Sequence, residues 1–192
     1  MKRLLLVRHA PTAATRSAAF PVDESLDERG EAAASALAQR LPTRCEAVSS
    51  PSRRCQETAA AAGLRPRLEP RIKECDFGTW AGRSLEDVYA EDPTAAAGWM
   101  TDPDACPHGG ESLTAFLRRV VTWLEDPTAH AGGYTVAVTH SGVVKASVVH
   151  ALGAPPLAFW RIDVTPLAIT ELHAHDGRWT LTRVNCRAGR AE

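Results

Sequence analysis

Short apolar segments alternate with amphipathic ones along this chain, and this alternation limits the possible folds more than any other feature. The run from Lys2 to Val7 is almost continuously apolar, as expected of a strand covered on both faces. Tyr134 to Val138 is a second such run, and residues 142–152 directly after it are typical of a helix. Strands that alternate with helices predict an α/β fold. We expect a three-layer α/β/α sandwich around a mostly parallel central sheet of about six strands.

The remaining elements are predicted from spacing and capping residues. Further strands are expected at 45–49, near 67–72, and at two or three of the segments 159–164, 167–173 and 178–184. Helices are expected from Asp27 to about Leu41, over 51–62, from the capping box Ser84–Asp87, and over 111–125. Residues 10–26 are expected to form a loop. No repeat or linker divides residues 1–192, so a single domain is predicted.

The composition limits the classes of partner. With 22 Lys+Arg against 23 Asp+Glu, the formal net charge is −1, which argues against nucleic acid or an anionic membrane as the main partner. No apolar run approaches the ~18 residues that a membrane span needs. The five cysteines are an odd number without a CxxC pair, which indicates reduced thiols. These features predict a cytoplasmic protein.

Polar residues directly follow two of the predicted strands. Arg8 and His9 come after the first apolar run, and His140 and Ser141 come after Val138. In open α/β sheets ligands bind beyond the carboxyl ends of the strands. If the two strands are adjacent, two imidazoles and a guanidinium meet at one sheet edge. The alternative is that these histidines only cap the sheet through hydrogen bonds.

A third segment adds an anion-binding pattern. Arg53 and Arg54 fall in the first turn of the predicted helix 51–62, immediately after a strand. Backbone N–H groups and the helix dipole favour an anion at that position. The planar, always charged guanidinium is well suited to phosphate.

Together these segments resemble the histidine phosphatase superfamily, which has the phosphoglycerate mutase-like fold. Six blocks, in the family's order, carry the resemblance and span residues 4 to 142. They are Leu4–Thr12 ("LVRHGET" in the family), Leu26–Gly30 ("LTExG"), Ser49–Ala59 ("SSxLxRAxxTA"), Lys73–Gly82 ("REIDFGxWEG"), His108–Leu113 ("PGGESL") and Val138–Gly142 ("VTHGG").

The resemblance implies a role for each matching residue. His9 would be the nucleophile that forms a phosphohistidine, and an imidazole is partly deprotonated at neutral pH. Arg8, Arg54 and His140 would surround the phosphoryl group as three cations, because phosphoryl transfer depends mostly on positioning and electrostatic stabilisation. Glu74 would protonate the leaving oxygen and then activate water.

Other expectations concern the substrate. With cations supplied by side chains, no metal and no cofactor are expected. Thr15 stands where the family often has a phosphate-binding Asn, and Thr15, Ser141 and His108 are predicted to contact substrate. Ala10 replaces the family's Gly after the Arg-His pair, which puts substrate contacts rather than the reaction in question. The predicted partner is a small-molecule phosphate monoester, and the resemblance allows a homodimer.

The short connection between Gly82 and His108 favours a phosphatase over a mutase, since the resemblance implies that mutases carry extra segments over the phosphoenzyme. Within the phosphatase branch the chain looks most like the alpha-ribazole phosphatases and their broad-specificity relatives, and a sugar or glycerate phosphate is another predicted substrate. A phosphoglycerate mutase-type transferase and a non-catalytic phospholigand-binding protein remain as alternatives.

Overall fold

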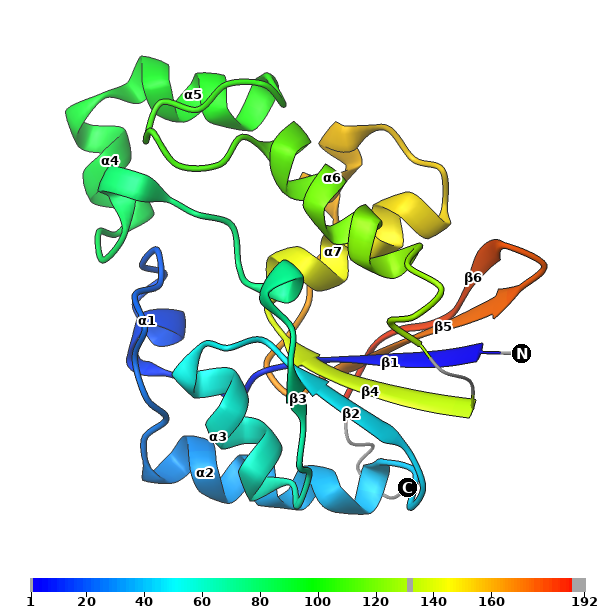
Figure 1. Cartoon of the computed structure of the whole chain (residues 1–192). Coiled ribbons are helices and arrows are strands. Elements are labelled where there is room, and N and C mark those ends of the chain that lie inside the picture. The colour runs from blue at the N-terminus through cyan, green and yellow to red at the C-terminus, as the bar shows by residue number, and fades with distance from the viewer. Residues whose placement is uncertain (1, 131–132, 188–192) are drawn as a thin grey trace.

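The computed structural model describes residues 2–130 and 133–187, which build a six-stranded mixed sheet (Figure 1). The strands are β1 (Lys2–Arg8), β2 (Glu46–Ser49), β3 (Arg67–Leu68), β4 (Gly133–Thr139), β5 (Ile169–His175) and β6 (Arg178–Cys186). Their order is β3-β2-β4-β1-β5-β6. The first four strands in that order are parallel, and β5 and β6 are antiparallel additions at one edge. The prediction of a mostly parallel sheet is confirmed.

Seven α-helices and four 3₁₀ helices belong to the described residues. The α-helices are α1 (Ala13–Arg16), α2 (Glu28–Ser35), α3 (Arg53–Ala61), α4 (Leu85–Glu91), α5 (Pro93–Thr101), α6 (Leu113–Leu124) and α7 (Ser141–Ala151). The 3₁₀ helices are η1 (Ala36–Arg40), η2 (Pro70–Ile72), η3 (Gly78–Trp80) and η4 (Pro156–Arg161). The Asp27 side chain caps α2, as predicted, by accepting from Gly30 N. None of these helices is long and apolar enough to cross a membrane.

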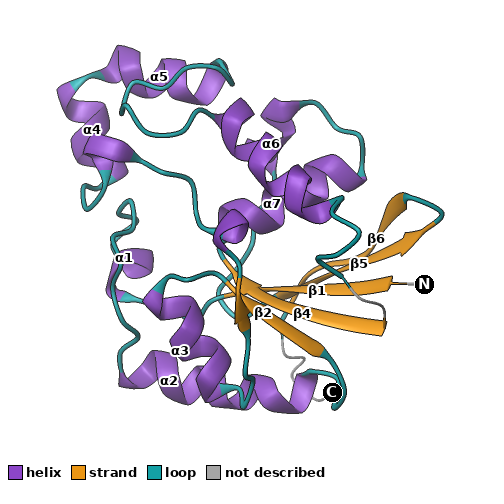
Figure 2. Ribbon diagram, in the orientation of Figure 1, coloured by secondary structure: helices purple, strands orange, loops and turns teal. Residues whose placement is uncertain are grey.

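Helices cover both faces of the sheet. Figure 2 shows α2 and α3 on one side and α6 and α7 on the other. Alternate side chains of β1 are divided between the two layers, as the two-residue period of a strand requires. Leu4 and Leu6 pack in the cluster that contains Phe116 of α6, whereas Leu5 packs with Cys55 of α3. The three-layer prediction is therefore confirmed.

Some local predictions were wrong or incomplete. Residues 159–164, one of the three tail candidates, do not form a strand, because 156–161 form η4 and Phe159 packs inward against the α6–α7 layer. The predicted loop 10–26 contains the short helix α1, closed by a capping box between Thr12 and Thr15. Helix α5 was not anticipated. It begins at Pro93 and is capped by the Asp92 side chain.

Helices α4 and α5 form a separate layer beyond the carboxyl ends of the parallel strands (Figure 1). Aromatic side chains hold this layer together, and Trp99 lies 5.6 Å from Phe20 and 5.5 Å from Trp80 between ring centroids. We call Phe20, Trp80, Val88, Ala96 and Trp99 the aromatic cluster. A cleft lies between this cluster and the strand ends, since Trp99 and His9 line the same hollow.

Candidate functional site

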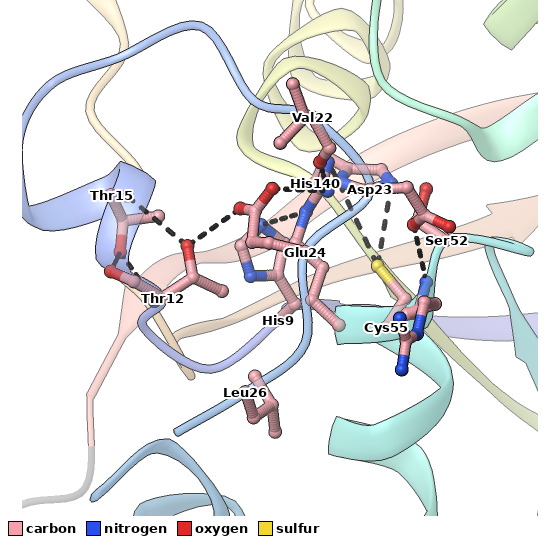
Figure 3. Close-up of polar contacts among 12 residues, drawn as sticks. His9, Thr12, Thr15, Val22, Asp23, Glu24, Leu26, Ser52, Cys55 and His140 are labelled. Carbon is pink, nitrogen blue, oxygen red and sulfur yellow. Dashed lines mark hydrogen bonds and ion pairs between the residues drawn. The ribbon is translucent and has the colours of Figure 1, made fainter. Parts of the chain in front are cut away.

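The parallel register of β1 and β4 brings the two predicted histidines together. Arg8 pairs with Thr139, so the residues that follow each strand are neighbours. His9 N donates to Thr139 O at 2.8 Å, and the ring centroids of His9 and His140 are 5.3 Å apart (Figure 3). The sequence prediction that two imidazoles meet at one sheet edge is confirmed as geometry.

Arg54 joins these histidines from the first turn of α3. Its Nε donates to Nε2 of His9 at 3.2 Å, and its Nη2 donates to Nδ1 of His140 at 3.1 Å. Thr58 fixes the position of α3, because its hydroxyl donates to Arg54 O and accepts from Ala10 N. Arg54 as a whole is only 3% exposed. The three segments singled out in the sequence therefore form one polar site.

The tautomer of His9 follows from its partners. Its Nδ1 lies 2.7 Å from Ala10 O, and because a carbonyl can only accept, Nδ1 carries the hydrogen. Nε2 therefore holds the lone pair, toward which Arg54 donates. Burial, together with the charges of Arg54 and Arg8, lowers the pKa of His9 to about 3. The ring is neutral at physiological pH, with a nucleophilic lone pair on Nε2.

His140 is neutral for similar reasons. Arg54 can only donate, so Nδ1 of His140 accepts and Nε2 donates to Ser50 Oγ at 2.9 Å. Complete burial, then the neighbouring His9 and Arg54, hold its pKa well below the usual range. The expectation from the sequence that His140 is a third cation therefore does not hold for this site. The guanidinium groups carry the positive charge.

The second guanidinium belongs to Arg8, at the end of β1. Its Nη1 donates to Val164 O, and its buried Nε has no hydrogen-bond partner among the described residues. Burial lowers the pKa of Arg8, and the nearby carboxylate of Glu74 opposes that shift. Arg8 and His9 line the same cleft. A guanidinium with an unused donor beside a neutral imidazole suits an oxyanion.

Glu74 lies opposite, against the start of α7. Its carboxylate accepts from Gly142 N at 3.2 Å and from Cys75 N at 3.1 Å. A Cβ atom at Gly142 would lie 2.1 Å from Glu74 Oε1, so only glycine leaves room for the carboxylate there. Glu74 lines the cleft together with Arg8 and His9. The structure thus places a carboxylate and a neutral imidazole around one space.

Arg119 holds the Glu74 segment, and sequence reasoning missed it. The guanidinium forms a two-pronged ion pair with Glu111 at 2.8 and 2.7 Å. It also donates to the backbone carbonyls of Arg71, Lys73 and Glu74. The helical spacing of α6 indicated only that Arg119 points away from the apolar stripe. Its carbonyl partners could be found only from the folded chain.

Residues 17–26, which we call the strap, contain a second group that the sequence did not reveal. Glu24 Oε1 accepts from Thr12 Oγ1 at 2.9 Å, and its Oε2 lies 3.6 Å from Nη1 of Arg54 (Figure 3). The backbone carbonyl of Val22 accepts from the same Nη1 at 2.7 Å. The strap therefore engages the Nη1 group of Arg54, a group that could also donate to an anion.

The three predicted substrate contacts have different surroundings. Ser141 lines the cleft. Thr15 also lines it, but its hydroxyl hydrogen is donated to Thr12 O at 2.8 Å, so the expected donor is already in use. His108 is 1% exposed, and its ring packs 5.1 Å from that of Trp80, so the structure does not bring it to the cleft wall.

The loop that carries His108 packs against the Glu74 segment instead. Thr79 N donates to His108 O, and Glu111 N donates to Asp76 O. A Cβ at Gly110 would lie 2.1 Å from Asp76 O, which explains this glycine by close backbone approach, whereas Gly109 has a left-handed backbone with φ of 70°. Within residues 2–130 and 133–187, no three His, Cys, Asp or Glu side chains gather where they could hold a metal ion.

Comparison with known proteins gives consistent matches. The sequence model of the histidine phosphatase superfamily (branch 1) matches residues 4–187. Phosphoserine phosphatase 1 of Hydrogenobacter thermophilus is 31% identical over 201 residues, which cover 98% of this chain and 95% of that protein.

Two solved structures extend the likeness to the fold. The alpha-ribazole phosphatase of Shigella flexneri is 26% identical, with a TM-score of 0.83, and the match covers 99% of both chains. A mycobacterial glucosyl-3-phosphoglycerate phosphatase in complex with VO3 is 28% identical, with a TM-score of 0.84, and the match covers 97% of this chain and 100% of that one.

Proposed function

The chain belongs to branch 1 of the histidine phosphatase superfamily and is a metal-independent phosphomonoesterase of that family, and we propose that it hydrolyses a small phosphorylated metabolite through a phosphohistidine on His9. The observation that carries the proposal is the His9 tautomer. The Ala10 carbonyl holds the hydrogen on Nδ1, and burial keeps the ring neutral. The Nε2 lone pair is therefore available beside Arg54 and Arg8.

In the first step, Nε2 of His9 attacks phosphorus while the bond to the ester oxygen breaks. Glu74 gives its proton to the departing alkoxide. Arg8 and Arg54 stabilise the charge on the equatorial oxygens of the phosphoryl group, and the neutral His140 beside them holds Arg54 in place through Nδ1. The buried position of Arg54 supports this role, since a guanidinium interacts more strongly with an anion where water is excluded.

In the second step, Glu74 accepts a proton from water, and the resulting hydroxide attacks the phosphorus of the phosphohistidine. The N–P bond breaks, inorganic phosphate leaves, and His9 regains its lone pair. The hydrogen bonds from Gly142 N and Cys75 N support this assignment, because they hold the carboxylate at the cleft wall for both steps.

The relatives named above act on different esters, so the metabolite is proposed by class. Candidates are alpha-ribazole phosphate, sugar phosphates and phosphoglycerates, all of them small phosphate monoesters. A hydrolysis screen over these compounds and phosphoserine would rank them by kcat/KM.

The decisive experiment traps the intermediate. Rapid acid-free quenching during turnover should leave phosphate on His9, in a linkage that is stable to base and labile to acid. His9→Ala should lose nearly all activity, because no neighbouring group replaces the attacking nitrogen. His150→Asn, which removes a half-buried histidine at the far end of α7, is the matched control and should keep normal turnover.

Full activity of His9→Ala would contradict the proposal. Isomerisation of phosphoglycerate faster than its hydrolysis would instead identify a mutase, the alternative that differs only in the acceptor of the phosphoryl group.

A further inference from the structure

We propose that the apolar cavity next to Glu74 holds the alcohol part of the substrate, and that Lys145 within it binds a second anionic group of that substrate. The preferred substrates are then phosphate monoesters with an aromatic or similarly apolar body and an anionic substituent. This inference rests on the proposed function, because Glu74 must face the leaving group for the cavity to be the leaving-group site.

The cavity adjoins the phosphate site. It has a volume of about 180 Å³ and opens beside the carboxylate of Glu74. Its walls are mostly aromatic or aliphatic; the lining residues that it shares with the cleft around His9 are Glu74, Phe77, Trp99, Ser141 and Trp160. An ester whose phosphorus lies at His9 and whose oxygen faces Glu74 therefore extends into this cavity.

Lys145 is the only cationic side chain among the cavity's lining residues. It lies four residues after Ser141 on α7, so the two side chains share one helix face, roughly 6 Å apart along the axis. The Lys145 Nζ lies 5.2 Å from the centroid of the Phe159 ring. A second anion of the substrate would therefore sit about one helical turn beyond the phosphate.

The ammonium group of Lys145 has no direct polar partner: it forms no hydrogen bond or ion pair with any residue in the described part of the chain. Burial lowers its pKa, and the charges of Glu74 and Asp163 only partly oppose that shift. A cation–π contact only partly offsets the lost hydration of an ammonium group. Glu74 is the one acidic residue that lines the cavity, and its oxygens accept from Gly142 N and Cys75 N. A substrate anion would complete the site.

The test compares two esters that differ by one charge, 4-carboxyphenyl phosphate and phenyl phosphate. The wild-type enzyme should prefer the carboxylated ester by about tenfold in kcat/KM, the range of a charge-assisted contact. Lys145→Met should abolish that preference, mainly through KM, and leave phenyl phosphate within about twofold. Lys145→Arg should restore part of it. A third ester, 1,4-phenylene bisphosphate, shows whether the second anion can also be a phosphate.

Lys2→Met is the matched control. It removes the same charge at the end of β1 that lies away from Arg8 and the cleft, so the variant should keep the full preference for the carboxylated ester. Equal losses of both esters in Lys145→Met, with a shifted pH profile, would show that Lys145 acts through Glu74 and would overturn the inference. The inference would also be overturned if the wild-type enzyme hydrolysed the two esters with equal kcat/KM. These results are separable from the proposed function, since trapping of phosphate on His9 does not depend on the preference.

Discussion

The imidazole of His9 is held between an acceptor and a donor, and this pair of contacts decides its chemistry. The Ala10 carbonyl takes the Nδ1 hydrogen, so Arg54 must meet the lone pair of Nε2. The lowered pKa means that the free enzyme does not need to deprotonate His9 anywhere near neutral pH. In the first step proposed above, the phosphoryl group has only to replace the hydrogen bond from Arg54.

We expect the Glu74→Gln variant to discriminate between leaving groups. The amide keeps the shape of the side chain but cannot transfer a proton, and general acid catalysis is commonly worth ~10²–10⁴-fold. Single-turnover release of an alkyl alcohol should slow by about that factor, whereas release of p-nitrophenolate, which needs little protonation, should slow much less. Equal slowing of both releases would show that Glu74 is not the proton donor.

Gly142→Ala should impair the acid–base step without unfolding the protein. The new Cβ would lie 2.1 Å from Glu74 Oε1, and the end of a side chain moves more easily than backbone. The displaced carboxylate should lower kcat on alkyl phosphates by about tenfold or more, with p-nitrophenyl phosphate less affected. Thermal unfolding should shift by only a few degrees. Gly98→Ala is the control, because a Cβ there meets nothing within 4 Å.

At the scale of elements, the strap and α3 share the guanidinium of Arg54. Val22 O and the Glu24 carboxylate lie on the side of Arg54 that does not contact the histidines. The strap is fixed elsewhere by backbone contacts, since Phe20 N donates to Arg83 O and Gly82 N donates to Phe20 O. An anion that binds Nη1 of Arg54 would therefore compete with Val22 O and the Glu24 carboxylate.

Glu24→Gln should strengthen inhibition by inorganic phosphate. The amide keeps a hydrogen bond to Thr12 but removes a negative charge 3.6 Å from Arg54. We expect the inhibition constant to fall by about threefold to tenfold, because one close charge pair at a partly buried site contributes on the order of 1 kcal/mol. The exposed Glu31→Gln variant of α2 controls for net charge. Weaker inhibition would show that Glu24 assists anion binding.

At the scale of the whole molecule, buried neutral histidines make stability depend on pH. Burial lowers the pKa of His9 to about 3 and that of His130 to about 4, and it lowers the pKa of His140 as well. In the unfolded chain the same groups take up protons below about pH 6.5. The unfolded state then binds more protons than the folded state, so stability is full above pH 6.5 and decreases as the pH falls toward 4.

We therefore expect the free energy of unfolding, measured with urea, to fall steeply between pH 6 and pH 5. Each such histidine contributes up to about 1.4 kcal/mol per pH unit in that window. His130 packs between Trp123 and Trp179, away from the cleft, so His130→Asn should reduce the slope by about one proton while activity is kept. An unchanged slope in this variant would show that His130 is already protonated in the folded protein.

The α/β class and the polar residues at the strand ends could be predicted from the sequence alone. Those signals are local: a strand has a two-residue period, a helix start needs a cap, and a residue after a parallel strand lies at the sheet edge. The adjacency of β1 and β4 then brought Arg8, His9 and His140 together. Arg54 could be predicted in the same way, because its position in the first turn of a helix is also a local feature of the sequence.

The charge and surroundings of these groups depend instead on how the whole chain folds. The histidines are neutral because they are buried. The contact of Glu24 with Arg54, and the hydrogen bonds from Arg119 to the Glu74 segment, join residues that are far apart in the sequence. Residues 156–161 became a 3₁₀ helix rather than part of a strand, because Phe159 packs against the helix layer. Desolvation and long-range contacts leave no local pattern in the sequence, because both arise only when folding brings distant segments together.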